Sequence, residues 1–351
     1  MRVFALPRDG NPYQELLYGE LRGLGFEVRY LADRTPSRTL NLLLLPTELL
    51  YARLSGGGVV HLHWVFGFGL PGGPRTRWLA RRWYDVVLAV IGLLRLPLVW
   101  TAHNVLPHDQ VFPDDLAARR ALVRRCALVI AHDEAALRRL DGLGLVPARA
   151  AVIPHGSYPA PAVPPPGATR ERTLLFFGRV APYKGVRELV AAFRALPAGH
   201  RARLRIVGSC PDPALAEELR AAAGAGVELD LRRVPEAELP EVFGSADAVV
   251  LPFREITTSG SALLALSYGR PLVLPRGVLP GLPAAAALRY DGAGLTRALA
   301  EAAALDRDVL EAMSRAALDH AARTSWPAIG EATASAFHGL LPGGATDGER
   351  T

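Results

Sequence analysis

The sequence is poor in cysteine and lysine and contains no long apolar run. Its two cysteines, Cys126 and Cys210, are too few for a disulfide framework or a cysteine-rich zinc site. The longest apolar run, Val86–Leu94, is far shorter than the roughly 20 residues that cross a bilayer. No charged segment followed by an apolar one opens the chain, so we expect no secretory signal. These absences predict a cytoplasmic protein.

Length and composition predict two folded domains. The chain has 351 residues, of which 50% are apolar, which suits two packed cores. Short apolar runs alternate with helical patterns in both halves, as is typical of βαβ units with parallel sheets. The segment SYPAPAVPPPG, residues 157–167, has five prolines and predicts a semi-rigid linker. The expected strands are 2–6, 26–31, 59–64, 98–102, 128–131, 151–154, 174–177, 204–207, 227–231, 247–252 and 271–274.

The predicted fold is therefore α/β, with two Rossmann-like domains. We expect the first domain over residues 1–157, the linker over 158–170 and the second domain over 171–324, followed by a helix at about 325–341. Ligands bind at the carboxyl ends of the strands in open α/β sheets. We expect the two domains to face each other across a cleft and to close about the linker.

Basic charge gathers in the first half. Residues 1–165 hold 19 of the 40 basic and 13 of the 34 acidic residues. The densest cluster, Arg75–Tyr84, combines four arginines with Trp78, Trp83 and a tyrosine and leads into the apolar run. Such a pattern is more typical of an anionic membrane surface than of a nucleic-acid platform. The alternative is an arginine-rich, solvated helix end that precedes a buried helix.

The loop after the first strand of the second half predicts a phosphate site. It reads GRVAPYKG and contains Gly178, Arg179 and Lys184, the only lysine among 40 basic residues. Two cations just ahead of a helix N-terminus can hold a diphosphate through charge and backbone N–H groups. The GxxxxGK[ST] spacing of a P-loop is absent. The alternative is an ordinary βα loop with solvated charges.

A second anion site is predicted at EITTSGS, residues 255–261. Thr258 and Ser259 can cap the helix that follows, which leaves free N–H groups for an anion. Gly260 would let a ligand approach the backbone closely. The alternative, a plain helix cap, is sufficient to explain Ser259 by itself.

Taken together, FFGRVAPYKG and TTSGSALLALSYGRPLV resemble the C-terminal half of family-4-type (group 1) glycosyltransferases of the GT-B fold. Further matches are IPHGS before the linker, ADAVVLPF and the helix at Trp326, which in this fold crosses back to the first domain. The resemblance implies that Arg179 and Lys184 hold the diphosphate of a nucleotide sugar. It also implies that His103, at the end of a strand, lies against the transferred sugar.

The resemblance assigns further residues of the first half to the acceptor or cleft. The loop after the first strand, with Gly10 and Asn11, contacts acceptor or diphosphate in the family. Asn104 follows the strand-end histidine, and His155 belongs to the match before the linker. No metal site is expected. His61 and His63 alternate on one strand without a third ligand nearby, and Asp306 and Asp308 open a helix that they would cap.

One departure concerns a pair of glutamates that typical members carry, the first near the donor sugar and the second on the ribose hydroxyls. The corresponding positions hold Ile256 and Leu264, and Glu255, one place from the first, is the candidate substitute. The base of the donor, UDP or GDP, stays open. By resemblance the reaction would retain anomeric configuration, with the leaving phosphate taking the acceptor proton. An inverting reaction would need a carboxylate base, for which Asp9 and Asp109 are the candidates.

The sequence thus predicts a metal-independent glycosyltransferase without a bound cofactor, in which the second domain binds the nucleotide sugar. The expected acceptor is a lipid-linked or cell-surface glycan, and the protein would sit peripherally on the inner face of the plasma membrane. One alternative is a soluble small-molecule acceptor. Another is a nucleotide-sugar-binding protein without turnover, which the missing acidic pair favours. Nucleic-acid binding is not expected.

Overall fold

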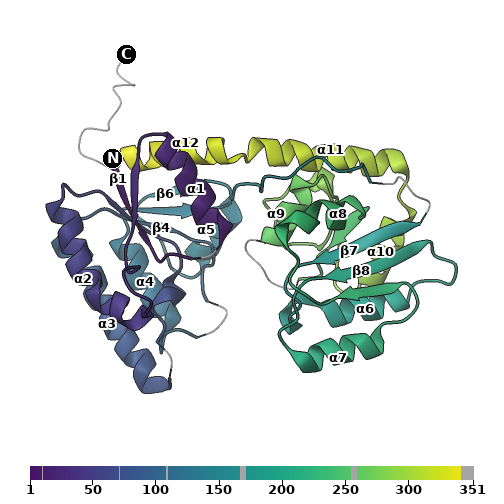
Figure 1. Ribbon diagram of the computed structural model, residues 1–351, viewed down its shortest axis with the longest axis horizontal. Coiled ribbons are helices and arrows are strands. Elements are labelled where there is room, and N and C mark those ends of the chain that lie inside the picture. Colours follow the sequence, from purple (N-terminus) through teal and green to yellow (C-terminus); the bar gives the residue numbers. More distant parts are fainter. Residues whose placement is uncertain (10, 71, 108–109, 167–170, 254–258, 341–351) are drawn as a thin grey trace, which may run out of the picture. The chain divides into compact units, whose positions relative to one another are not determined.

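The computed structural model describes the chain except for residues 10, 71, 108–109, 167–170, 254–258 and 341–351 (Figure 1). It divides into two compact units. The first unit comprises Met1–His155 together with Trp326–Thr351, and the second comprises Gly156–Ser325. Each unit contains one six-stranded parallel sheet with helices packed against it. The predicted α/β class with two Rossmann-like halves is confirmed.

The sheet of the first unit has the strand order β2-β1-β3-β4-β5-β6. Its strands are β1 (Arg2–Leu6), β2 (Glu27–Tyr30), β3 (Val59–Leu62), β4 (Leu98–Thr101), β5 (Leu128–Ala131) and β6 (Ala150–Val152). Its helices are α1 (Pro12–Gly23), α2 (Arg38–Leu54), η1 (Val65–Phe68), α3 (Pro74–Leu93), α4 (Asp115–Arg125), α5 (Glu134–Gly142) and α12 (Trp326–His338).

Alternation along the strands builds two cores on the two faces of this sheet. Along β1, Phe4 and Leu6 pack in a core with residues of α2, α3 and α4, whereas Val3 and Ala5 pack in a core with α1 and α12. Because successive side chains of a strand point to opposite faces, the strands β1, β3, β4 and β5 contribute to both layers. The helix α12 thus belongs to the first unit, as the family resemblance implies, although it is the last helix along the described chain.

The second unit repeats this architecture with the order β12-β11-β10-β7-β8-β9. Its strands are β7 (Arg172–Phe177), β8 (Ala202–Val207), β9 (Val227–Asp230), β10 (Ala248–Val250), β11 (Leu272–Pro275) and β12 (Ala287–Tyr290). Its helices are η2 (Pro182–Lys184), α6 (Val186–Arg194), α7 (Pro213–Ala222), η3 (Glu236–Glu238), α8 (Leu239–Gly244), α9 (Gly260–Ser267), η4 (Ala284–Ala286), α10 (Leu295–Ala304) and α11 (Arg307–Arg323). The edge strand β12 is missing from the sequence prediction.

The described part of the proline-rich segment is bound to the second unit. Ser157 donates its backbone N–H to the carbonyl oxygen of Thr324 at 2.8 Å, and the two hydroxyl groups lie 2.7 Å apart. Farther along, the guanidinium of Arg270 donates to the carbonyl oxygen of Pro164. The segment is therefore attached by side-chain and backbone hydrogen bonds.

Candidate active site

The backbone conformation of the loop between β7 and α6 requires glycine at two positions. Gly178 has φ +132°, and a Cβ there would lie 2.6 Å from Oγ of Ser261. Gly185 has φ +70°, and a Cβ there would lie 2.6 Å from the carbonyl oxygen of Pro252. Only glycine tolerates both the dihedral angle and the close contact. The loop therefore lies against the end of β10 and the first turn of α9.

Lys184 is the buried cation of this loop. Its side chain is 8% exposed, and its Nζ lies 4.1 Å from the centre of the Phe253 ring, a cation–π arrangement. Burial lowers the pKa of this ammonium group to about 8, because desolvation disfavours the charged form. Arg179, by contrast, is exposed and makes no hydrogen bond or ion pair with the other described residues. Both cations therefore keep their hydrogen-bonding capacity for an anion.

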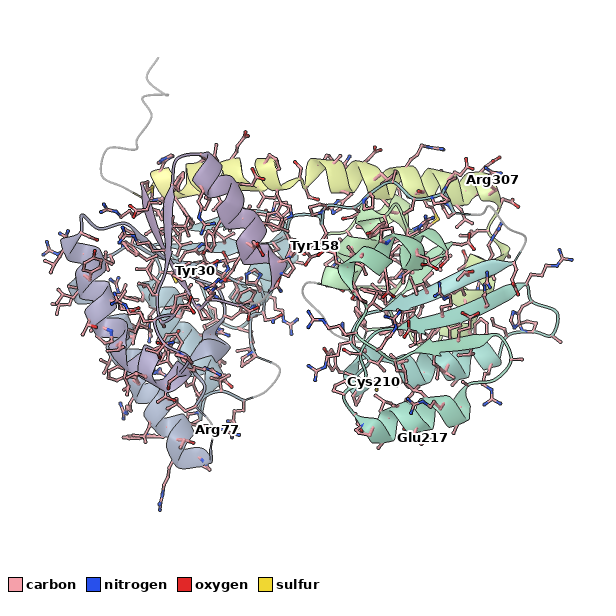
Figure 2. All side chains as sticks on the ribbon, in the orientation of Figure 1. Tyr30, Arg77, Tyr158, Cys210, Glu217 and Arg307 are labelled. Atoms are coloured by element: carbon pink, nitrogen blue, oxygen red, sulfur yellow. The ribbon has the colours of Figure 1, made fainter. Side chains whose placement is uncertain are left out.

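The first turn of α9 supplies free backbone N–H groups next to this loop. Ser259 is buried at the N-cap position, and its hydroxyl accepts a hydrogen bond from the N–H of Ala262 at 3.2 Å, which confirms the predicted cap. Gly260 is approached by the linker, because a Cβ there would lie 3.2 Å from the hydroxyl of Tyr158 (Figure 2). Glu255 and Thr258 lie outside the described residues.

In the first unit, the turn after β1 is built from its own polar groups. Asn11 is the N-cap of α1, and its side chain accepts from the N–H of Tyr13 at 3.0 Å. The carboxylate of Asp9 accepts from the N–H of Asn11 at 2.8 Å. Asn104 is half-buried and its side chain bonds to none of the described residues. Gly10 and Asp109 are outside the described part of the chain.

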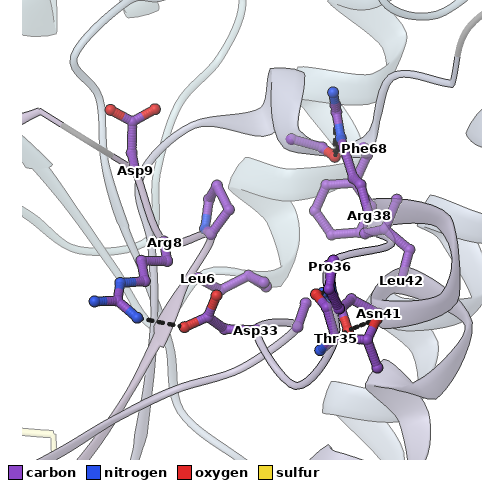
Figure 3. A pocket seen from close by; sticks show the side chains of 13 residues that line it. Leu6, Arg8, Asp9, Asp33, Thr35, Pro36, Arg38, Asn41, Leu42 and Phe68 are labelled. Atoms are coloured by element: carbon purple, nitrogen blue, oxygen red, sulfur yellow. Dashed lines mark hydrogen bonds and ion pairs between the residues drawn. The ribbon is translucent and has the colours of Figure 1, made fainter.

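Next to this turn lies a pocket of about 460 Å³ at the ends of β1 and β2 (Figure 3). The guanidinium of Arg8 and the carboxylate of Asp33 point toward each other across its edge and bond at 2.8 Å. Arg38 donates twice to the carbonyl oxygen of Gly67, at 2.8 and 2.9 Å. Asp9 also lines the pocket. Polar side chains beside apolar ones are typical of small-molecule sites.

His103 and His155 belong to a group of buried rings at the carboxyl ends of β3 to β6. The imidazole of His103 bonds through Nε2 to Nδ1 of His63 and through Nδ1 to Nε2 of His132, both at 3.0 Å. Both ring nitrogens of His103 are thus occupied by other histidines. His155 packs its ring edge on Tyr13, with ring centres 4.8 Å apart. These contacts join residues from four strands and α1.

Sequence reasoning missed His132, Tyr13 and Tyr18 as members of this group, which we call the histidine cluster (His61, His63, His103, His132 and His155 with Tyr13 and Tyr18). His132 directly follows β5, so its position at a strand end was a usable signal. Burial lowers the pKa of His61 to about 3 and of His132 to about 4, and it lowers those of His63 and His103 well below the usual range. The four rings are therefore neutral at pH 7.

Metal binding is not supported by the described residues, which contain no group of His, Cys, Asp or Glu side chains arranged to hold an ion. We expected no metal at His61 and His63 because no third ligand would lie nearby. That reason was wrong, because other histidines do lie nearby. Both nitrogens of His61 bond to hydroxyl groups, and those of His63 bond to the Tyr18 hydroxyl and to His103. Asp306 is at the N-cap position of α11, but its side chain makes no capping hydrogen bond.

Two family models match the chain. "Glycosyltransferase Family 4" covers residues 13–157, and "Glycosyl transferases group 1" covers residues 171–315. A GDP-mannose:glycolipid 4-beta-D-mannosyltransferase of Xanthomonas campestris pv. campestris is 32% identical over 231 residues, 64% of this chain and 63% of that protein. The match thus spans less than two thirds of this relative. A D-inositol 3-phosphate glycosyltransferase of Corynebacterium glutamicum is 26% identical, over 87% of this chain and 80% of that protein.

Solved structures agree on the fold. Anabaena HepE in complex with UDP matches with TM-score 0.69 at 16% identity, covering 96% of this chain and 99% of that chain. The sucrose-phosphate synthase of Thermosynechococcus elongatus matches with TM-score 0.71 at 17% identity, covering 97% and 99%. With one family model on each sheet-containing unit and this shared architecture, the chain belongs to the group 1 glycosyltransferases of the GT-B fold.

Proposed function

We propose that this chain transfers a sugar from a nucleoside diphosphate sugar to a hydroxyl group of a glycolipid. The observation that carries the proposal is the packing of the β7–α6 loop against α9. Gly178 abuts Ser261 of the first turn of α9, and Lys184 lies over Phe253 at the end of β10. Two elements that can each bind an anion therefore adjoin, with two cations that have no anionic partner among the described residues.

These groups suit the charge that develops when the glycosyl bond breaks. The leaving nucleoside diphosphate gains negative charge at its β-phosphate. Lys184, Arg179 and the N–H groups of α9 would stabilise that charge, and such electrostatic stabilisation is usually the largest catalytic contribution. Because these positive groups can supply the counter-charge, the proposed reaction needs no metal ion.

The choice of donor and acceptor follows from the relatives' names. The Xanthomonas relative is named for GDP-mannose and a glycolipid, so GDP-mannose is the first donor to test and a lipid-linked glycan the first acceptor. The pocket beside Asp9 and Phe68, with polar and apolar lining, is the proposed acceptor site. HepE was solved with UDP, so a UDP sugar is the second donor.

The anomeric outcome has two candidates. Retention is what the family resemblance implies. Inversion is favoured by a specific observation: the Xanthomonas relative is named for a β-mannoside product, and the mannose of GDP-mannose is α-linked. An inverting transfer needs a base that takes the acceptor proton. Leu264, at one position of the missing acidic pair, packs against the apolar core of the second unit. We therefore propose inversion with Asp9 as the base.

Slow hydrolysis of the donor tests the function without a known acceptor. Purified protein is incubated with GDP-mannose, and the first-formed mannose is observed by ¹H NMR before its anomers equilibrate. We expect release of GDP with β-mannose formed first, loss of release in Lys184→Ala, and normal release in the matched control Arg220→Ala on α7. α-Mannose formed first would establish retention. If GDP binds but neither hydrolysis nor transfer occurs, the protein is a nucleotide-sugar binder without turnover.

We also propose that the first unit contacts an anionic membrane. Large apolar side chains 44–84% exposed crowd α2 and α3; they are Leu40, Leu43, Leu50, Tyr51, Leu54, Trp78, Leu79, Val86 and Leu93. Arg82 lies over the exposed Trp78 ring at 5.2 Å, and Arg77 is in the first turns of α3 (Figure 2). Exposed apolar groups next to arginines fit an interface with anionic lipid. No helix among the described residues is long and apolar enough to span a membrane.

Vesicle flotation distinguishes a protein that binds anionic membranes from one that acts on a soluble acceptor. We expect the protein to float with vesicles that contain phosphatidylglycerol, less so at high salt, and not with phosphatidylcholine alone. The double variant Trp78→Ser/Leu79→Ser should stay in solution, whereas Leu318→Ser, an exposed apolar residue of α11, should float like the wild type. Equal flotation of all three proteins would refute the α2–α3 contact.

A further inference from the structure

The histidine cluster contains one continuous chain of hydrogen bonds. It starts at the hydroxyl of Thr101, which is 2.8 Å from Nε2 of His61, and passes through the hydroxyl of Tyr18, 3.0 Å from Nδ1 of His61. The same Tyr18 hydroxyl is 2.7 Å from Nε2 of His63. From His63 the chain continues through both nitrogens of His103 to His132.

The last hydrogen bond of this series, at His132, determines which nitrogen carries the hydrogen in every ring. Nδ1 of His132 lies 3.1 Å from the carbonyl oxygen of Ile153. A carbonyl oxygen only accepts, so Nδ1 of His132 carries the hydrogen. Because the ring is neutral, its Nε2 is bare and accepts from Nδ1–H of His103. The same step then assigns Nδ1–H to His63.

Tyr18 continues the same direction of hydrogen-bond donation to the ring of His61. Its hydroxyl donates to the bare Nε2 of His63 and accepts from Nδ1–H of His61, whose bare Nε2 accepts from Thr101. All four imidazoles are therefore Nδ1–H tautomers, and all six hydrogen bonds run one way. A second direction would require Ile153 to donate through its carbonyl group, which is impossible.

Neither end of this series of hydrogen bonds allows a proton to leave. Thr101 is fully buried, and the Ile153 carbonyl group cannot take a proton. The groups around these hydrogen bonds are mostly uncharged: Tyr13 packs on His103, Trp326 packs on Tyr13, and His155 lies 5.3 Å from His132, ring centre to ring centre. Asp133, which caps α5 and acts on His132, and Arg22, which acts on Tyr18, are the charged groups that influence it.

We infer that His63 and His132 are positioning residues that hold His103 in one tautomer and one orientation, so that His103 shapes the sugar site without transferring protons. The inference rests on the proposed function and on the place beside the transferred sugar that the family resemblance implies for His103. A ring whose two nitrogens are both hydrogen-bonded to neighbours has no lone pair for an acceptor proton. The base in an inverting transfer is then a carboxylate, and Asp9, at the acceptor pocket, is the described candidate.

Imidazole ¹⁵N NMR tests the tautomer assignment directly. In protein labelled with ¹⁵N-histidine, long-range ¹H–¹⁵N spectra distinguish a protonated Nδ1 from a protonated Nε2. We expect four rings, assigned by single-variant loss of signal to His61, His63, His103 and His132, to be neutral with hydrogen on Nδ1 from pH 6 to 8. Hydrogen on Nε2 of any of them, or a doubly protonated ring at pH 7, would overturn the inference.

Two variants of His132 test the positioning role. His132→Gln keeps an oxygen that accepts from Nδ1–H of His103, whereas His132→Leu removes it. We expect the Leu variant to lose at least tenfold in kcat with donor KM nearly unchanged and to shift the His103 signals. The Gln variant should keep kcat within about threefold and keep the His103 signals.

Equal kcat in both variants, or equal loss in both with unshifted His103 signals, would refute positioning. If the Leu variant fails to fold, the Gln variant and the wild-type spectra still test the inference. A Gln variant with normal spectra but tenfold lower kcat contradicts it. A wild-type protein that shows the expected spectra but no transfer would instead refute the proposed function, and with it the role of His103 at the sugar.

Discussion

Lys184 is the residue on which the proposed donor site depends most. A compact ammonium group fits the space above the Phe253 ring, where the larger planar guanidinium of an arginine would need more room. We expect Lys184→Ala to weaken GDP binding roughly 10- to 100-fold, because a charge-assisted hydrogen bond contributes about 1.5–3 kcal/mol. Isothermal titration calorimetry measures this, with Arg220→Ala as the matched control. An unchanged affinity would remove the lysine from the site.

The lowered pKa of Lys184 also predicts a pH dependence of binding. Its pKa is about 8, so the ammonium group loses its charge as pH rises through 8. GDP affinity of the wild type should therefore fall between pH 7.5 and 9, and the same titration of Lys184→Ala should be flat. A decrease of equal size in both proteins would show that another group is responsible.

At the scale of elements, the glycine contacts of the second sheet predict a stability effect. Gly208, with φ +143°, follows β8, and a Cβ there would lie 2.1 Å from the carbonyl oxygen of Gly178. Gly208→Ala should lower the free energy of unfolding by at least about 1–3 kcal/mol, because both dihedral strain and a backbone clash result. Gly224→Ala, which meets only the Arg194 side chain at 3.4 Å, should be nearly neutral. Urea denaturation measures both, and equal stabilities would contradict the close approach of Gly208 to the Gly178 carbonyl group.

The histidine cluster ties the strand ends of the first sheet to α1 and makes this unit sensitive to acid. An unfolded histidine has a pKa near 6.5, whereas those of folded His61 and His132 are about 3 and 4. Between these values the unfolded chain binds more protons, so stability falls as pH falls below 6.5. These two rings alone should cost about 3 kcal/mol between pH 6.5 and 5.

Denaturant titrations at several pH values measure this loss. The double variant His61→Phe/His132→Phe provides the comparison, since its remaining dependence on pH should be shallower even if its stability at neutral pH is lower. A wild-type slope no steeper than that of the variant would contradict neutral burial of the two rings.

At the scale of the whole molecule, the last helix of the described chain helps to complete the first fold. Trp326, at the start of α12, is buried with its ring 5.2 Å from that of Tyr13. Trp326→Ala should destabilise the first unit by about 3–5 kcal/mol and leave the second unit unchanged. Hydrogen exchange read by mass spectrometry should show lost protection in α1 and β1, whereas the exposed-site control Leu318→Ala should not. Lost protection confined to residues 156–325 would contradict the assignment of α12.

Several features can be predicted because they are encoded in short segments. Ser259 is identifiable as a cap from its place before an apolar helix, and the loop at Gly178 from a glycine and two cations after a strand. The strand β12 escapes prediction because Ala287–Tyr290 is short and follows a segment rich in proline, glycine and alanine. The cluster partners of His103 escape it because Tyr18, His63 and His132 are far apart in the sequence.

The sequence by itself determined the strands other than β12 and where cations, caps and glycines fall along the chain, since these properties depend on neighbours a few residues away. Only the tertiary structure decided that β3, β4 and β5 lie side by side, so that their terminal histidines bond to one another. It also decided that Lys184 is buried over an aromatic ring. Strand order and burial bring distant residues together, and a hydrogen bond or a shifted pKa arises only from that proximity.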